Sequence, residues 1–279
     1  MKKTIAMLTA AALTLSLAAC SSAPASSADS AASSGSTAAS TAEQSAADSV
    51  RIAIVQQMDH ASLDQIRAAI EAELDAQAAE QGITVEYELF NGQNDTTTLN
   101  QIGTQVVGDG YDAIIPIATL AAQCMVNAAA ETETPVIYAA ISDPATADLT
   151  DISYVTGTSD YLDTEFIMEM MFTANPDIQT VGLLYSNSEP NSEAAIAAAR
   201  AYLDEKGVAY VEATGNTNDE VLAAAVTLAD QANAVFTPTD NVIMAAAGAV
   251  SATFTEAGIP YYTGCLLYTS DAADEARSV

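Results

Sequence analysis

Hydroxyl, amide and carboxylate side chains follow five stretches of the chain that read as buried strands. These groups are Met58-Asp59-His60-Ala61-Ser62, Thr119, Ser142-Asp143-Pro144, Asn187-Ser188-Glu189-Pro190-Asn191-Ser192 and Thr239-Asp240-Asn241. Each group on its own is explained by helix capping, because Ser, Thr, Asp and Asn satisfy the free N–H groups of a helix N-terminus. Together they indicate more, since helix N-termini also bind carboxylates and Asp143 or Asp240 would neutralise an ammonium. The combination predicts a site for a small zwitterionic ligand.

The sequence gives little indication of a metal site, a catalytic site or nucleic-acid binding. The chain has one histidine, His60, and three cysteines without a CxxC pair, so no metal site is expected. No GxSxG motif presents a serine nucleophile. A surface hydrolase with Asp143 and Asp240 as paired carboxylates is the weaker alternative. The formal charge of −30 opposes nucleic-acid binding, and we expect a monomer that is not an enzyme and needs no cofactor.

Alternating strands and helices must position the polar groups. Strands are predicted over residues 51–57, 83–89, 111–118, 134–141, 179–186, 208–214, 233–238 and 259–264, and helices over 62–80, 96–110, 120–131, 165–175, 192–207, 219–232 and 241–258. This alternation predicts parallel sheets with right-handed crossovers. Two such blocks, joined near residues 154–161, predict an α/β fold of two doubly wound lobes with a hinge. Ligands bind outside the carboxyl ends of parallel strands, so the polar groups are expected to face one cleft.

The first 49 residues have the composition of a leader and a tether. Lys2 and Lys3 precede a short apolar run, which predicts a secretory signal peptide over residues 1–19. The segment Leu17-Ala18-Ala19-Cys20 resembles the bacterial lipobox, which implies a lipidated Cys20 anchored at the extracytoplasmic face of the cell membrane. The alternative is an ordinary signal peptide with an incidental cysteine. Residues 20–49, rich in Ser and Ala, predict a disordered tether.

The folded body is predicted over residues 50–264, with an N-terminal lobe at 50–158 and a C-terminal lobe at 159–264. The pattern of strands and helices stops after this body, where residues 265–279 read CLLYTSDAADEARSV. This segment resembles the translation of a transposon-end adapter used in sequencing libraries. It predicts a non-native tail on a C-terminally truncated chain, and a genuine acidic tail is the alternative.

Several segments of the body resemble one protein family. They are IVQQMDHASLDQIRAAI, IATLAAQ, the SDP at 142–144, LLYSNSEPNSEAAI and FTPTDN. They are similar to the ABC-transporter substrate-binding lipoproteins related to tryptophan- and tyrosine-binding receptors, over residues 50–264. The resemblance implies a type I periplasmic-binding fold, an ABC permease as partner and an aromatic amino acid as ligand. The family's usual Ala-Thr-Pro is Ala118-Thr119-Leu120 here, so the hydroxyl is kept and the proline is lost.

The resemblance also implies roles for individual residues. Thr119 and Ser142 would bind the ligand carboxylate, and Asp240, with Asp143, would hold the amino group. The remaining expected contacts are hydrogen bonds from Asn191 and Asn241 of the second lobe and a side-chain pocket shaped by Met58, His60 or Tyr161. Closure of the hinge around the ligand would create the form that the permease recognises. A sensor that reports the ligand to a membrane signalling protein is the alternative reading.

Overall fold

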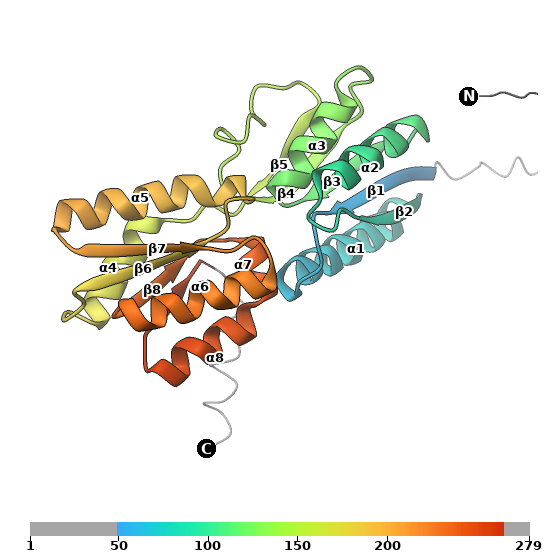
Figure 1. The fold of residues 1–279 in the computed structure, drawn as a ribbon. Helices are drawn as coiled ribbons and strands as arrows, with labels where there is room; N and C mark the ends of the chain where they lie inside the picture. The colour runs from blue at the N-terminus through green and yellow to red at the C-terminus, as the bar shows by residue number, and fades with distance from the viewer. Residues whose placement is uncertain (1–48, 265–279) are drawn as a thin grey trace, which may run out of the picture. The chain divides into compact units, whose positions relative to one another are not determined.

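The computed structural model describes residues 49–264, which form two parallel β-sheets (Figure 1). The first has the order β2-β1-β3-β4-β5 and consists of β1 (Ser49–Gln56), β2 (Thr84–Asn91), β3 (Ala113–Ile117), β4 (Val136–Ile141) and β5 (Val155–Ser159). The second has the order β7-β6-β8-β9 and consists of β6 (Thr180–Tyr185), β7 (Ala209–Thr214), β8 (Ala234–Thr237) and β9 (Tyr261–Thr263). All neighbouring strands pair in parallel, which confirms the predicted sheet type.

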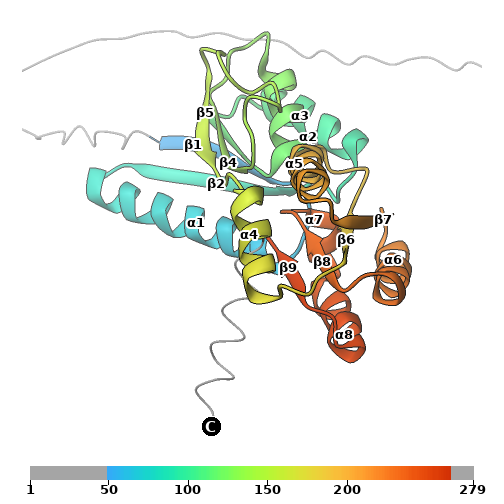
Figure 2. The same cartoon turned by 90° about the vertical axis from the view of Figure 1, so that its left-hand side faces the viewer.

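Helices cover both faces of each sheet (Figure 2). In the first lobe these are α1 (Ala61–Gln81) on one face, with α2 (Thr96–Gly108) and α3 (Thr119–Ala129) on the other. In the second lobe α4 (Thr164–Ala174) and α5 (Pro190–Lys206) cover one face, and α6 (Asn218–Gln231), α7 (Asn241–Ala245) and α8 (Ala247–Ala257) cover the other. Strands enclosed in this way are continuous apolar runs such as that of β3, in which four of the five residues are buried. The two lobes are therefore doubly wound, as predicted.

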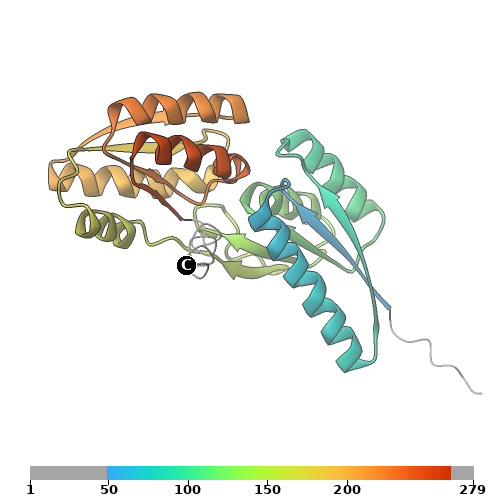
Figure 3. The same cartoon turned by 90° about the horizontal axis from the view of Figure 1, so that it is seen from below.

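The link between the lobes differs from the prediction. Residues 154–161 were expected to join the two blocks, but Val155–Ser159 form β5 at the edge of the first sheet. Gly157 is required there, because a Cβ atom at this position would lie 2.2 Å from the backbone oxygen of Tyr138. The crossing itself is confined to residues 160–163, between β5 and α4 (Figure 3).

A second correction concerns the helix predicted over residues 241–258. The structure divides it into α7 and α8, which meet at Ala246. Asp240 caps α7 by accepting a hydrogen bond from the backbone N–H of Ile243. Nothing in the sequence accounts for the break at Ala246.

The membrane-related predictions fall outside the described residues. The signal peptide, the lipidated Cys20 and the tether up to residue 48 precede the described residues, and the predicted tail begins after residue 264. Ser49, predicted as the last residue of the tether, is instead the first residue of β1. Within 49–264, every helix is too short or too polar to cross a bilayer. In the same range, His, Cys, Asp and Glu side chains form no group of three that would hold a metal ion.

Candidate functional site

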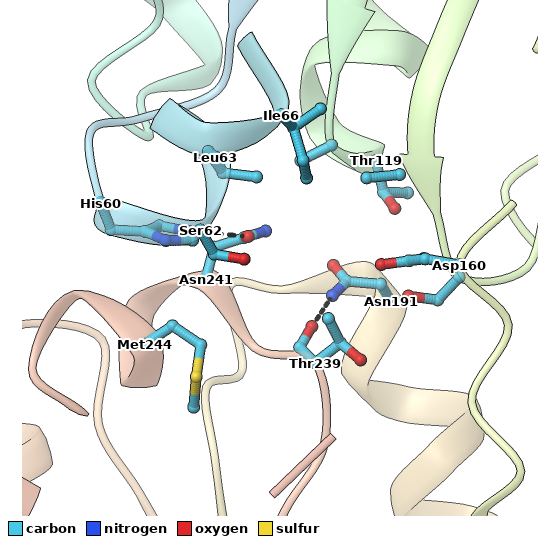
Figure 4. A pocket seen from close by; sticks show the side chains of 13 residues that line it. His60, Ser62, Leu63, Ile66, Thr119, Asp160, Asn191, Thr239, Asn241 and Met244 are labelled. Atoms are coloured by element: carbon cyan, nitrogen blue, oxygen red, sulfur yellow. Dashed lines mark hydrogen bonds between the residues drawn. The ribbon is translucent and has the colours of Figure 1, made fainter. Parts of the chain in front are cut away.

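The carboxyl ends of strands from both sheets meet around one cavity (Figure 4). The first lobe contributes His60, Ser62, Leu63, Ile66, Ala118, Thr119, Ala140, Ser142 and Asp160, and the second contributes Asn191, Thr239, Asn241 and Met244. Polar residues that follow strands of both sheets therefore share one cleft, although not every residue of the predicted groups reaches it. Leu63, Ile66 and Met244 give the lining an apolar part beside these polar groups.

The cavity is narrow. Its volume is about 20 Å³, which is room for about one water molecule. An amino acid does not fit into this space unless its walls move apart. The walls come from two lobes that are linked only at residues 160–163 within the described chain, so separating the lobes would widen it.

The lining contains two hydrogen-bond acceptors, one on Asn191 and one on Asp160. The Asn191 amide nitrogen donates to the backbone oxygen of Thr239, and a carbonyl only accepts, so the orientation of this amide is fixed. Its other atom, Oδ1, is buried without a partner, and Asp160 contributes its carboxylate to the same lining (Figure 4). Asp160 stays exposed to solvent, but partial loss of hydration raises its pKa, against the opposing effect of the Ser142 hydroxyl. The cavity therefore offers two acceptors to a ligand that carries donors.

The backbone is strained at two points of the lining. Ala118 has a φ angle of 76° and Ala140 one of 58°, in the left-handed region that favours glycine. These alanines lie next to Thr119, the first residue of α3, and close to Ser142. Strain of this kind concentrates at functional sites, at a cost on the order of 1–3 kcal/mol per residue.

Hydrogen bonds join the two lobes beside the cavity. Gln57 donates from Nε2 to Glu189 Oε1 over 2.7 Å, and His60 Nε2 lies 3.1 Å from Asn241 Oδ1. Gln57 also donates to Asn94 and accepts from the backbone N–H of Leu120 in α3. A buried glutamine thus ties the start of α3 to the second lobe.

Glu189 and Asp240 form a pair of buried carboxylates in the second lobe. Burial raises the pKa of Glu189 to about 8, and the nearby charge of Asp240 adds to the shift. Burial also raises the pKa of Asp240, against hydrogen bonds from Ser192, Ile243 and Ser186. Glu189 is 2% exposed and Asp240 is fully buried, so each carboxylate depends on protein donors instead of water.

The structure places five of the nine residues predicted to bind the ligand in the lining. These are His60, Thr119, Ser142, Asn191 and Asn241. The other four lie elsewhere. Met58 packs beside the core under α1, and Asp143 accepts from the N–H groups of Ala145 and Thr146. Tyr161 is 74% exposed, and Asp240 lies buried behind the lining, with its oxygens used by Ser186, Ser192 and Ile243.

No sequence pattern predicts a functional role for Asp160, Gln57 or Glu189. Asp160 directly follows β5, a strand that was not predicted, so no strand end pointed to it. Gln57 is the last residue of the strand predicted over residues 51–57, and Glu189 belongs to the polar group at 187–192 that helix capping explains. Their burial left no signal in the sequence, because glutamine and glutamate are mostly exposed in folded proteins and are seldom fully buried unless they are paired.

A larger hollow, of about 380 Å³, lies on the first lobe between α2, α3 and residues 147–149. Its lining contains no residue of the second lobe and none of the predicted ligand-binding residues. The cleft between the lobes is therefore the stronger candidate, although its present volume is smaller.

The raised pKa of Glu189 predicts how stability depends on pH. The folded state holds this proton more tightly than the unfolded chain, whose pKa is near 4.5. The contribution of this proton to the free energy of unfolding is therefore complete below pH 4.5. It is lost as the pH rises towards 8, by at most about 1.4 kcal/mol per pH unit. We expect the free energy of unfolding, measured with urea, to fall less between pH 5 and pH 8 for Glu189→Gln than for the wild type.

Glu193→Gln provides the control for this comparison. Glu193 lies one turn further along α5 and is exposed, so its substitution removes the same charge from the surface. We expect it to leave the pH dependence of the wild type almost unchanged. Equal slopes for the two variants would contradict the assignment of a raised pKa to Glu189.

Comparison with known proteins finds relatives with sequence similarity. A family model described as ABC transporter substrate binding protein matches residues 51–266. The tyrosine-binding protein of Clostridioides difficile is 31% identical over 214 residues, which are 75% of this chain and 61% of that protein. The crystal structure of the ABC domain in complex with L-Trp from Streptococcus pneumonia is 29% identical, with a TM-score of 0.70 over 77% of this chain and 74% of that chain.

A more distant structure agrees in fold. The leucine binding protein of Thermotoga maritima is 16% identical, with a TM-score of 0.52 over 68% of this chain and 56% of that chain. The predicted type I periplasmic-binding fold is confirmed by these neighbours. Since the family model extends over more than half of its length, the chain belongs to the family of ABC transporter substrate-binding proteins.

Proposed function

We propose that this protein is the extracytoplasmic receptor of an ABC importer and binds an aromatic amino acid between its lobes. The observation that carries the proposal is the cavity formed by strand ends of both sheets, with polar groups from each. The tyrosine-binding protein and the L-Trp complex among the relatives support the choice of ligand.

The polarity of the lining suggests how such a ligand would lie. Its ammonium group would donate to Asp160 and to the unpartnered Oδ1 of Asn191. Among residues 49–264, no Lys or Arg lines the cavity. The carboxylate would therefore depend on the hydroxyls of Thr119 and Ser142 and on the positive N-terminal end of α3. The aromatic ring would then lie towards Leu63, Ile66 and Met244.

Ligand entry would require the lobes to part, because the cavity leaves room for about one water. Closure would restore the Gln57–Glu189 and His60–Asn241 contacts between the lobes. A ligand that touches both lobes would favour the closed form by its differential affinity for it. In our proposal the permease recognises that form, and a lipidated Cys20 keeps the receptor at the membrane.

Thermal unfolding of the full chain with amino acids tests this function. A ligand that binds only the folded state must raise the melting temperature, so L-tyrosine or L-tryptophan should raise it at millimolar concentration. Tyramine lacks the carboxylate and indole-3-propionate lacks the ammonium group, so each should have a much smaller effect. If none of the twenty amino acids changes the melting temperature, the proposed function is wrong.

A further inference from the structure

Glu189 lies in the contact between the lobes and is held by donors from both. Its Oε1 accepts from Gln57 Nε2 of the first lobe over 2.7 Å. Its Oε2 accepts from Asn241 of the second lobe, from Nδ2 over 2.7 Å and from the backbone N–H over 3.4 Å. Glu189 is 2% exposed, so these two amides, and not water, must supply the donors or acceptors that each of its protonation states requires.

The amide of Gln57 cannot turn to suit Glu189. Its Oε1 accepts from the backbone N–H of Leu120 over 3.0 Å, and a backbone N–H only donates. Nε2 therefore faces Asn94 Oδ1 and Glu189 Oε1, and Glu189 must present an acceptor on this side in every state.

The amide of Asn241 has no such constraint on its side chain. In the structure its Nδ2 faces Glu189 and its Oδ1 faces His60 Nε2 over 3.1 Å. This arrangement requires an ionised Glu189 and a proton on Nε2 of His60. With a proton on Glu189 Oε2, the amide would turn, its Oδ1 would accept that proton's hydrogen bond and its Nδ2 would donate to His60 Nε2. The imidazole would then carry its proton on Nδ1.

We propose that Glu189 is a positioning residue of the cleft, which decides through Asn241 which ring nitrogen of His60 carries the proton. His60 and Asn241 both line the cavity, so Glu189 sets whether that wall offers a donor or an acceptor. The consequence for a ligand rests on the proposed function, whereas the arrangement of the three residues does not.

The surroundings of His60 favour a neutral imidazole. Burial lowers the pKa of His60, against the hydrogen bond of Asn241 and the charges of Asp64 and Asp59. Around Glu189, the charged neighbour is Asp240, which raises its pKa further after the larger effect of burial. His60 is therefore neutral over the pH range in which Glu189 titrates. When Glu189 ionises, the change that reaches His60 through Asn241 is a change of tautomer, not of charge.

Nitrogen-15 NMR of the imidazole tests the proposal without any ligand. His60 is the single histidine of the chain, so its ring signals are unambiguous, and protonated and unprotonated ring nitrogens differ widely in shift. Glu189→Gln would place Oε1 towards Gln57 and Nε2 towards Asn241, which reproduces the donor of a protonated glutamate. We expect Nδ1–H as the main tautomer of this variant at every pH where His60 is neutral.

The wild type and a control complete the experiment. Between pH 7 and pH 10 the wild type should change from Nδ1–H to Nε2–H as Glu189 ionises, and Glu193→Gln should change in the same way. A tautomer that stays the same in the wild type over this range, or a Glu189→Gln variant that keeps Nε2–H, would overturn the proposal. If Glu189→Gln does not fold, the titration of the wild type decides alone, and failure of amino acids to bind would leave this result unaffected.

Discussion

Asp160→Asn should bind L-tryptophan about 10- to 100-fold more weakly than the wild type, because a hydrogen bond to a charged group contributes about 1.5–3 kcal/mol. The substitution keeps the size of the side chain and one acceptor, but it replaces a carboxylate of the lining by an amide. The ammonium group would then have the unpartnered Oδ1 of Asn191 as its remaining acceptor. Isothermal titration calorimetry with the full chain measures the loss.

Asp143→Asn is the matched control for this loss. The sequence offered Asp143 for the same role, but in the structure its carboxylate accepts from the N–H groups of Ala145 and Thr146 and lies outside the lining. We expect the affinity of Asp143→Asn for L-tryptophan to stay within about twofold of the wild type, because substitutions on the surface away from a site have small effects. An equal loss in both variants would show that Asp160 has no special role. Asp160→Asn should also leave the binding of indole-3-propionate, which has no ammonium group, unchanged.

Periodicity of apolar residues was enough to predict most of the fold. Strands such as β3 and β6 are buried on both faces, so their composition identifies them without any knowledge of their neighbours. The strand β5 has a different character, since Val155 is partly buried and the next four residues are exposed. Its place in the sheet comes from pairing with β4, which no local pattern records. Because β5 was not predicted, Asp160, which directly follows it, was not predicted as a site residue either.

The candidate site could be predicted only where it coincides with strand ends. Thr119, Ser142, Asn191 and Asn241 reach the cavity because their positions after strands are fixed by the parallel topology. Asp240 occupies an equivalent position, but its carboxylate turns inwards to three protein donors. Whether a polar residue at such a position caps a helix or faces the cleft depends on its side-chain rotamer, which the sequence does not contain. The contact of Gln57 with Glu189 joins residues 132 positions apart and has no local signature at all.

Asp240 is consequently expected to matter for stability more than for direct contact with a ligand. Its carboxylate accepts from the backbone N–H groups of Ser186 and Ile243 and from the Ser192 hydroxyl, over distances of 2.7 to 3.0 Å. These bonds join the end of β6, the start of α5 and the start of α7 around one fully buried group. Asp240→Ala would leave all three donors without their acceptor.

The expected loss is about 3 kcal/mol of unfolding free energy. Each buried donor left unsatisfied costs roughly 1–3 kcal/mol, while removal of a charge next to Glu189 and entry of water offset part of the sum. For a chain of this size the loss corresponds to a fall of roughly 6–12 °C in melting temperature. Urea unfolding at pH 7 measures it directly.

Asp163→Ala separates this effect from ordinary helix capping. Asp163 caps α4 in the same lobe and accepts from the backbone N–H of Phe166, but it is exposed. Loss of such a cap costs about 1 kcal/mol. If Asp240→Ala destabilises the protein no more than Asp163→Ala does, then Asp240 is a helix cap like any other, and the three bonds around it add nothing to the stability of the second lobe.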